Sequence, residues 1–364
     1  MRRRKFIVAL GTAAVGVLIL FAALLFSSWP ISRAQDQVVL LRGAGSDQVL
    51  LLRGAGSTFA APLYKKWIEE YGVSHRGVTI SYDAVGSGEG VKRFIEHSVD
   101  FAGSDEVLSS NELAKVPDAL MLPITAGMIA IAYNIPGVNS EIKLPRDVYV
   151  DIFARKIRKW DDPRIQAANP GIAFPRREIA LVVRQDSSGT TAAFTNHLAT
   201  IGSSWRAAGM DVGKFIEWPS AVLSAPGNEG VAARVRLSEG SIGYVEYWFA
   251  QRLGLQMAAL QNKAGNFITP TGHAGELGLS GRVAQVQELA ASVADPSATD
   301  AYPLVTYSWM FIYSRYVDQA KAMALRDFAG WSLSDRGQDY GAQLGYLPLS
   351  SDVLGIGRQT LGEP

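Results

Sequence analysis

The 364-residue chain contains no cysteine, and its charges nearly cancel, with a formal net charge of +1. Disulfides, thiolate metal sites and cysteine nucleophiles are therefore excluded. The small net charge argues against a nucleic-acid-binding surface. Only four residues offer imidazole nitrogens, and they lie far apart without metal-ligand spacing: His75, His97, His197 and His273. We therefore expect packing or surface histidines and no metal site.

Several enzyme motifs are also missing. The sequence has no Gly-x-Ser-x-Gly elbow, no His-Glu-x-x-His motif and no Gly-Lys-Ser/Thr phosphate loop. Ser140 and Lys143 match Ser-x-x-Lys, but the companion motifs of that enzyme class are absent. A hydroxyl without a neighbouring base is a poor nucleophile. We therefore expect a binding protein without a cofactor, and not an enzyme.

The N-terminus combines basic and apolar segments. Residues 2–5 are Arg-Arg-Arg-Lys, and an apolar run from Phe6 to Phe26 follows. Because small residues flank Arg33, we predict a signal peptide, residues 1–34, cleaved after Ala34. The run is also close to membrane-spanning length, so an uncleaved anchor is the alternative. Either way, we expect the body of the protein to leave the cytoplasm.

A tandem repeat follows this leader. Residues 38–46 return as residues 49–57 with one substitution, and only the second copy continues into Phe59 and Pro62. We therefore predict that residues 35–48 are a spacer with a duplicated segment, for which the sequence suggests no use.

The second copy opens a strand, glycine turn and helix start. An apolar run, Val49–Leu52, precedes Gly54–Pro62, and the helical face of Leu63, Trp67 and Tyr71 follows. Pro62 suits the first turn of a helix, and Thr58 adds a hydroxyl near the N-cap. A helix N-terminus favours an anion, although a single turn of this kind is also an ordinary connection.

Two similar turns recur downstream. Gly86–Gly90 follows the β-type run Val78–Ala84, and Asp186–Thr190 follows the run Ile179–Arg184. We expect a helix after each turn, with Val91, Phe94, Ile95 and Ser98 on one face of the first and Phe194, Leu198 and Ile201 on one face of the second. Ligands of open α/β sheets bind at the carboxyl ends of strands. The turns therefore predict a donor-rich cage for a tetrahedral oxyanion, formed by backbone N–H groups and these side chains: Thr58, Ser87, Arg184, Ser188 and Thr190.

A third short strand, Val99–Asp105, carries an acid at its end. A carboxylate beside an anion is repulsive unless a proton lies between them, and phosphate keeps such a proton whereas sulfate does not. Asp105 would therefore select phosphate; its alternative role is a helix cap or a surface acid. Asp186 either holds the Arg184 guanidinium or stabilises its own turn.

The remaining pattern indicates two lobes, because about 310 residues exceed one typical domain. Met121–Ile135 predicts one or two buried strands, with a crossover at Pro136-Gly137, and Tyr307–Ser314 predicts a returning strand. Residues 318–333 predict an amphipathic helix before a tail rich in loops. We assign residues 49–135 and 305–364 to lobe 1, and residues 136–304 to lobe 2.

From about Gly54 to about Pro348 the chain resembles the periplasmic phosphate-binding proteins of phosphate ABC transporters. The likeness is carried by the phosphate-loop segments 54–62, 85–92 and 184–190, by the strand with its proton-accepting acid at 99–105, and by further signatures at Lys159–Asp162 and Ile242–Tyr247. It implies an α/β, two-lobed type II binding-protein fold with two crossover strands. It also implies delivery of phosphate to a membrane permease with an ATPase, and a monomer.

The resemblance implies that the ion is bound by backbone N–H groups and by side chains. The N–H groups belong to Ser57, Phe59 and Gly189. The side chains are those of Thr58, Ser87, Asp105, Arg184, Ser188 and Thr190. The chain departs from the family in its apolar N-terminus, its repeat and Glu89, which either weakens binding or favours its helix N-terminus. A membrane-tethered phosphate sensor or scaffold with the same site, and an enzyme acting on phosphoesters, are the alternative functions.

Overall fold

The computed structural model describes residues 49–219, 221–279, 289 and 293–362. These described residues belong to one compact unit. The expected leader, the spacer and the first copy of the repeat lie outside them. Among the helices of the described ranges, none combines the length and the apolar character needed to cross a membrane.

The described residues form a mixed sheet with the strand order β2-β1-β3-β12-β4-β8-β6-β7, and β9 pairs with β4. β1 is parallel to β2 and β3, β6 is parallel to β7 and β8, and β12 is antiparallel to both β3 and β4. The strands are β1 (Leu50–Gly56), β2 (Val78–Asp83), β3 (Phe101–Ser104), β4 (Ala119–Asn134), β6 (Ala180–Arg184), β7 (Leu223–Ala225), β8 (Ser241–Glu246), β9 (Gln256–Met257) and β12 (Val305–Tyr313).

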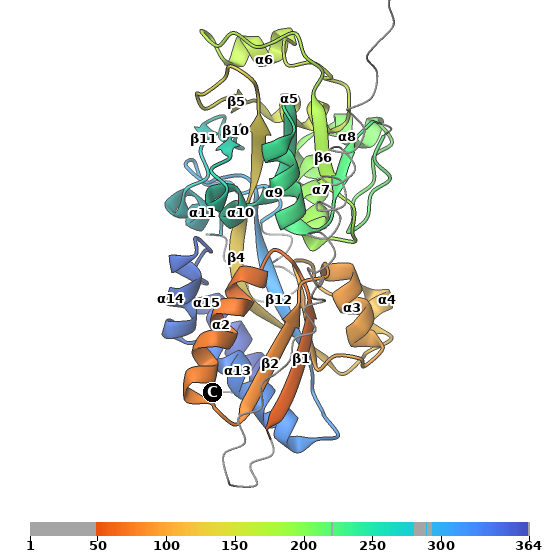
Figure 1. Ribbon diagram of the computed structural model, residues 1–364, viewed down its shortest axis with the longest axis vertical. Helices are drawn as coiled ribbons and strands as arrows, with labels where there is room; N and C mark the ends of the chain where they lie inside the picture. The colour runs from red at the N-terminus through yellow and green to blue at the C-terminus, as the bar shows by residue number, and fades with distance from the viewer. Residues whose placement is uncertain (1–48, 220, 280–288, 290–292, 363–364) are drawn as a thin grey trace, which may run out of the picture. The chain divides into compact units, whose positions relative to one another are not determined.

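The apolar segment 121–135 is one strand, β4. It is continuously buried from Leu122 to Tyr133, as expected of a strand covered on both faces. β4 pairs with β12 as far as Met128 and with β8 from Ile129, so it passes from one half of the sheet to the other (Figure 1). The change of partner falls inside β4, before Pro136, and the lobe boundaries at residues 135/136 and 304/305 remain predictions.

Helices cover both halves of the sheet (Figure 1). A small second sheet has the order β11-β10-β5, formed by β5 (Lys143–Leu144), β10 (Ala259–Gln261) and β11 (Phe267–Ile268). The helices are α2 (Ala61–Ser74), α3 (Ser87–Ile95), α4 (Ser110–Leu113), α5 (Arg146–Phe153), α6 (Pro163–Ala168), α7 (Gly189–Ile201), α8 (Ser203–Ala207), α9 (Gly227–Leu237), α10 (Tyr247–Arg252), α11 (Gly272–Gly278), α13 (Gln319–Ser332), α14 (Asp335–Gln343) and α15 (Ser351–Leu361).

The helices predicted after the three turns are present as α2, α3 and α7. α2 buries Leu63, Trp67 and Tyr71 as expected. The prediction for the second helix was wrong at its end, because α3 stops at Ile95 and Ser98 is exposed. His97 has a φ of +54°, so the backbone leaves the helical conformation before Ser98.

The prediction of a loop-rich tail was also wrong, because α14 and α15 follow α13. Ser334 and Ser350 cap the two helices through their side chains. Glycines within both helices weaken the sequence signal. Gly337 is required by packing, since a Cβ there would lie 2.5 Å from the Ser332 carbonyl oxygen.

A close approach of β1 to β3 places the first turn. Gly56 has a φ of +142°, and a Cβ on it would lie 2.0 Å from the Gly103 carbonyl oxygen. Only glycine fits this position. The contact brings the residue after β1, Ser57, next to the residue after β3, Asp105.

Candidate functional site

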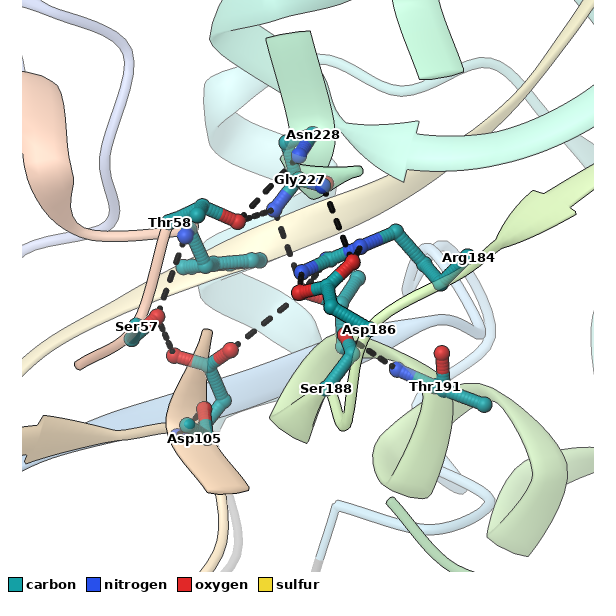
Figure 2. Close-up of polar contacts among 12 residues, drawn as sticks. Ser57, Thr58, Asp105, Arg184, Asp186, Ser188, Thr191, Gly227 and Asn228 are labelled. Carbon is teal, nitrogen blue, oxygen red and sulfur yellow. Dashed lines mark hydrogen bonds and ion pairs between the residues drawn. The ribbon is translucent and has the colours of Figure 1, made fainter. Parts of the chain in front are cut away.

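The ends of β1, β3 and β6 meet at one cluster of polar side chains (Figure 2). Asp105 lies at its centre and is 5 % exposed. It accepts hydrogen bonds from the hydroxyls of Ser57 at 2.6 Å, Ser308 at 2.9 Å and Thr190 at 3.3 Å. Both carboxylate oxygens are therefore directed by fixed donors.

Burial dominates the electrostatics of Asp105. It raises the pKa of this carboxyl to about 6, although three hydroxyl donors and the Arg184 charge act in the opposite direction. The hydroxyls stabilise the ionised form and burial destabilises it. A proton donor that reaches this carboxylate therefore gains more than it would at an exposed acid.

Arg184 presents its guanidinium from the end of β6, and its side chain is 1 % exposed. Asp186 binds it through two contacts, Nε to Oδ1 at 2.9 Å and Nη2 to Oδ2, which is the first of the two alternative roles considered for this acid. Nη1 donates to Thr190 Oγ1 at 3.4 Å. Burial acts to raise the pKa of Asp186, but the bonds and charge of Arg184 outweigh it and the pKa lies below its usual value.

The first turn of α7 closes this side of the cluster. Ser188 caps the helix, its Oγ accepting from the Thr191 N–H at 3.1 Å. Gly189 lies so close to the second turn that a Cβ would be 2.6 Å from Ser87 Oγ. The helix N-terminus, which favours negative charge, is thus directed at the cluster.

The second turn contributes Ser87, the first residue of α3, which is 1 % exposed. Its Oγ accepts from the Asp105 N–H at 3.4 Å, and the next residue, Gly88, donates its N–H to the Ser187 carbonyl at 3.0 Å. Glu89 lies in the first turn of α3 and forms an ion pair with Arg93 at 2.9 Å. Its charge is therefore balanced within its own helix.

The contacts of the first turn differ from expectation at three residues. The Ser57 N–H already donates to the Gly103 carbonyl at 2.8 Å, because β1 and β3 continue their contact there. The Phe59 N–H donates to Ser57 Oγ at 3.0 Å. Thr58 does not cap α2, whose N-cap is Ala60 without a side-chain bond. Thr58 Oγ1 instead accepts from Asn228.

Three residues of the cluster are not predicted from the sequence. Asn228 lies in the first turn of α9, and the signal that was available is a further strand–glycine turn–helix junction after β7. Ser308 lies within the apolar strand β12, and only its pairing with β3 and β4 brings it to Asp105. Glu246 ends β8, is fully buried and caps α10.

The two signature segments of the sequence have structural contacts. Trp160 is fully buried and donates from Nε1 to the Gly240 carbonyl at 2.8 Å. Residues 242–246 belong to β8, whereas Tyr247 begins α10. Both segments therefore support the half of the sheet that carries β6 and β8.

A cleft of about 840 Å³ opens beside the cluster. Its lining includes Thr58 and Asp186, which also belong to the cluster, together with the cationic Lys65 and Arg252. The Arg252 guanidinium lies 4.8 Å from the centre of the Trp248 ring. The cleft therefore borders the polar cluster at Thr58 and Asp186.

No group of three or more potential metal-ligating side chains comes together in the part of the chain that the structure describes. His197 is buried, contacts Tyr149 Oη at 2.9 Å and the Ala294 carbonyl at 2.7 Å, and has its pKa lowered to about 4 by burial. It is a neutral packing residue.

Comparison with known proteins places the chain in a class of solute-binding proteins. A family model described as "PBP superfamily domain" matches residues 33–336, so the chain belongs to this superfamily. The expected type II fold with two crossover strands is confirmed. A phosphate-bound periplasmic phosphate-binding protein, PfluDING, superposes with a TM-score of 0.69 and 20% identity, covering 85% of this chain and 93% of the other.

A second solved structure shares the fold, and one sequence relative shows the family. An ABC-type phosphate transport receptor from Vibrio cholerae has a TM-score of 0.55 and 16% identity, covering 81% of this chain and 99% of the other. The phosphate-binding protein PstS of Methanocaldococcus jannaschii is 33% identical over 353 residues, 91% of this chain and 88% of PstS. The chain belongs to the PstS family.

Proposed function

We propose that this protein binds inorganic phosphate at the cluster around Asp105 and delivers it to an ABC-type permease. The observation that supports this function is a buried acid among fixed hydroxyl donors, facing an arginine that a second acid holds in place. A site of this kind offers one acceptor and many donors, which matches the hydrogen phosphate ion. Membership of the PstS family points to the same ligand.

The donors fall into two groups. Side-chain donors come from the turns after β1, β2 and β6, and we assign to phosphate the following: Thr58, Ser87, Arg184, Ser188 and Thr190. Thr190 exchanges its bond to Asp105 Oδ2 for the ion in this proposal. Backbone donors come from Gly189, at the N-terminus of α7, and from Phe59 if its bond to Ser57 is exchanged for the ion. Ser57 acts through its hydroxyl, which directs the Asp105 carboxylate.

Asp105 supplies the selectivity in this proposal. Its carboxylate accepts a hydrogen bond from the O–H group that phosphate retains at neutral pH. Sulfate has no such proton, so two acceptors would face each other without a bond. A site built on one such hydrogen bond rejects an analogue that lacks it by about 10⁴–10⁵.

We propose that the protein works outside the cytoplasm, as the PfluDING protein is periplasmic, and that it acts as a monomer. Closure around the ion shifts an equilibrium between open and closed forms. Residues 1–34 are a signal peptide or an anchor in this proposal, and N-terminal sequencing of the protein from its host separates the two. A chromogenic phosphate ester should show no turnover.

Titration calorimetry with phosphate and sulfate at equal ionic strength tests the function. Wild-type protein should bind phosphate much more tightly than sulfate. Asp105→Asn should reduce the difference between the Kd values for the two ions. Asp335→Asn, at an exposed position in α14, is the matched control and should change neither affinity. An unchanged phosphate-to-sulfate ratio in Asp105→Asn would remove the role assigned to this carboxylate.

A further inference from the structure

Asn228 is fully buried at the start of α9 and connects three segments of the chain. Its backbone N–H and its Nδ2 both donate to Thr58 Oγ1, at 3.2 and 3.1 Å (Figure 2). Nδ2 also donates to Thr190 Oγ1 at 3.2 Å. Oδ1 accepts from the Glu246 N–H at 2.9 Å. One side chain therefore contacts two threonines assigned to the site.

The last of these bonds decides which way the amide faces. A backbone N–H can only donate, so the Asn228 oxygen must be the atom that faces Glu246. The Nδ2 group must then face the two threonines. Because Asn228 is buried and held at both ends, this orientation is a property of the fold.

The orientation has a consequence for the Thr58 hydroxyl. A hydroxyl has two acceptor positions and one hydrogen. The two N–H groups of Asn228 occupy both acceptor positions of Thr58 Oγ1. The hydrogen is left to donate, and no acceptor for it is found among the residues that the structure describes.

Thr190 is arranged in a similar way. Its Oγ1 accepts from Asn228 Nδ2 at 3.2 Å and from Arg184 Nη1 at 3.4 Å, and it donates to Asp105 Oδ2 at 3.3 Å. The hydrogen of the Thr190 hydroxyl therefore points away from Asn228, toward Asp105 Oδ2. Asn228 fills both acceptor positions of the Thr58 hydroxyl. For Thr190 it fills one position and Arg184 fills the other, and the hydrogen is donated to Asp105.

We propose that Asn228 is a positioning residue that commits the Thr58 hydroxyl to donate to the ion and, together with Arg184, keeps the Thr190 hydroxyl a donor, so that the site accepts an oxyanion with free acceptor oxygens. This inference rests on the proposed binding of phosphate at the cluster. It adds a residue that touches the ligand only through its neighbours. A hydroxyl that is free to rotate would have to be ordered on binding, and part of the affinity would be lost.

A double-mutant cycle in the full chain tests the proposal. Phosphate titration calorimetry is run on wild type, Asn228→Ala, Thr58→Val and the double variant. Asn228→Ala should weaken phosphate binding by about 10- to 100-fold, in the range of one or two lost charge-assisted hydrogen bonds. In the Thr58→Val background the same change should cost several-fold less, because the hydroxyl it directs is gone.

Thr58→Ser, which keeps the hydroxyl and both Asn228 contacts, should bind nearly as wild type does. The matched control is Asn134→Ala. Asn134 Nδ2 donates to the carbonyls of Val235, at 3.2 Å, and Arg236, at 2.9 Å, at the other end of the same helix. This variant should lose stability without losing affinity.

If Asn228→Ala does not fold, Asn228→Ser replaces it in the cycle, because a serine is too short to direct both threonines. Fully additive losses in the cycle would overturn the proposal and leave Asn228 with a structural role. Absence of phosphate binding by wild-type protein would instead contradict the proposed function, so the two failures are distinguishable.

Discussion

Thr190 Oγ1 lies 3.3 Å from Asp105 Oδ2, although the two residues are 85 positions apart and follow different strands. The contact joins the turn after β6 to the end of β3. It also means that the carboxylate of Asp105 is held by hydroxyl groups from several separate segments of the chain.

Asp105→Asn should stabilise the ligand-free protein at neutral pH. The folded pKa of Asp105 is about 6 and the usual value is 3.8. A group whose pKa is raised on folding stabilises the folded state at a pH below its usual pKa of 3.8. This stabilisation is lost as the pH rises through the folded pKa of about 6. In urea unfolding, the free energy of unfolding of Asp105→Asn should therefore exceed that of wild type by up to roughly 3 kcal/mol at pH 7.5. The difference should vanish near pH 4. An equal advantage at both pH values would contradict this assignment.

The selectivity for phosphate over sulfate should decrease as the pH is lowered, because Asp105 becomes protonated. Below a pH of about 6, Asp105 is protonated and becomes a donor, which sulfate can accept. The ratio of sulfate Kd to phosphate Kd should therefore be smaller at pH 5 than at pH 8, as measured by competition titration. Asp105→Asn should show a much flatter pH dependence of this ratio; if it follows wild type, another group controls the change.

Arg184→Lys should weaken phosphate binding by about 100-fold or more, because lysine keeps the charge but loses the planar fork held by Asp186. Calorimetry gives the Kd directly. Arg177→Lys is the control, since Arg177 pairs with the exposed Glu239 at 2.9 Å, away from the cluster. A phosphate Kd within a few-fold of wild type for Arg184→Lys would mean that the third turn does not bind the ion.

Glu246→Gln should stabilise the protein above neutral pH. Glu246 is fully buried, Oε1 accepts from the Trp248 N–H at 2.9 Å, and Oε2 has no hydrogen-bond partner among the described residues. Burial raises its pKa well above 4.5. Its contribution to stability is therefore lost as the pH rises from 4.5 upward. Thermal melts at pH 5 and pH 8.5 should show a gain only at the higher value.

Lys214→Met should raise the phosphate Kd several-fold. Lys214 Nζ lies 2.8 Å from Glu112 Oε1, and its carbonyl accepts from the Ser188 N–H at 2.7 Å, so one residue links α4 to the cap of α7. A partly buried pair of this kind contributes about 1 kcal/mol. Glu112→Gln should have a similar effect, and the double variant should not exceed either one. Independent, additive losses would argue against the link.

Local signals in the sequence were enough for a large part of the fold. Strand, glycine turn and helix follow one another within about ten residues, and Arg184 and Asp186 are two positions apart, so their pairing needs only the turn that joins them. The apolar run 121–135 predicts buried strand structure, but the length of β4 as one strand depends on having β12 and β8 as successive partners.

The failures have a common cause. The glycines of α14 and α15 lower helix propensity, and packing against the rest of the molecule restores the helices. The Ser57 N–H was expected to be free, but the approach of β1 to Gly103 satisfies it. Nothing within either segment predicts this contact.

The sequence alone determined three features: the order of strands and turns, the acid after β3, and the hydroxyls at the helix starts. These features depend only on local periodicity and turn chemistry. The tertiary structure decided which of these groups meet. Ser308 and Asn228 reach the cluster through strand register and through the position of α9. Burial, which raises the pKa of Asp105, exists only once the segments are packed together.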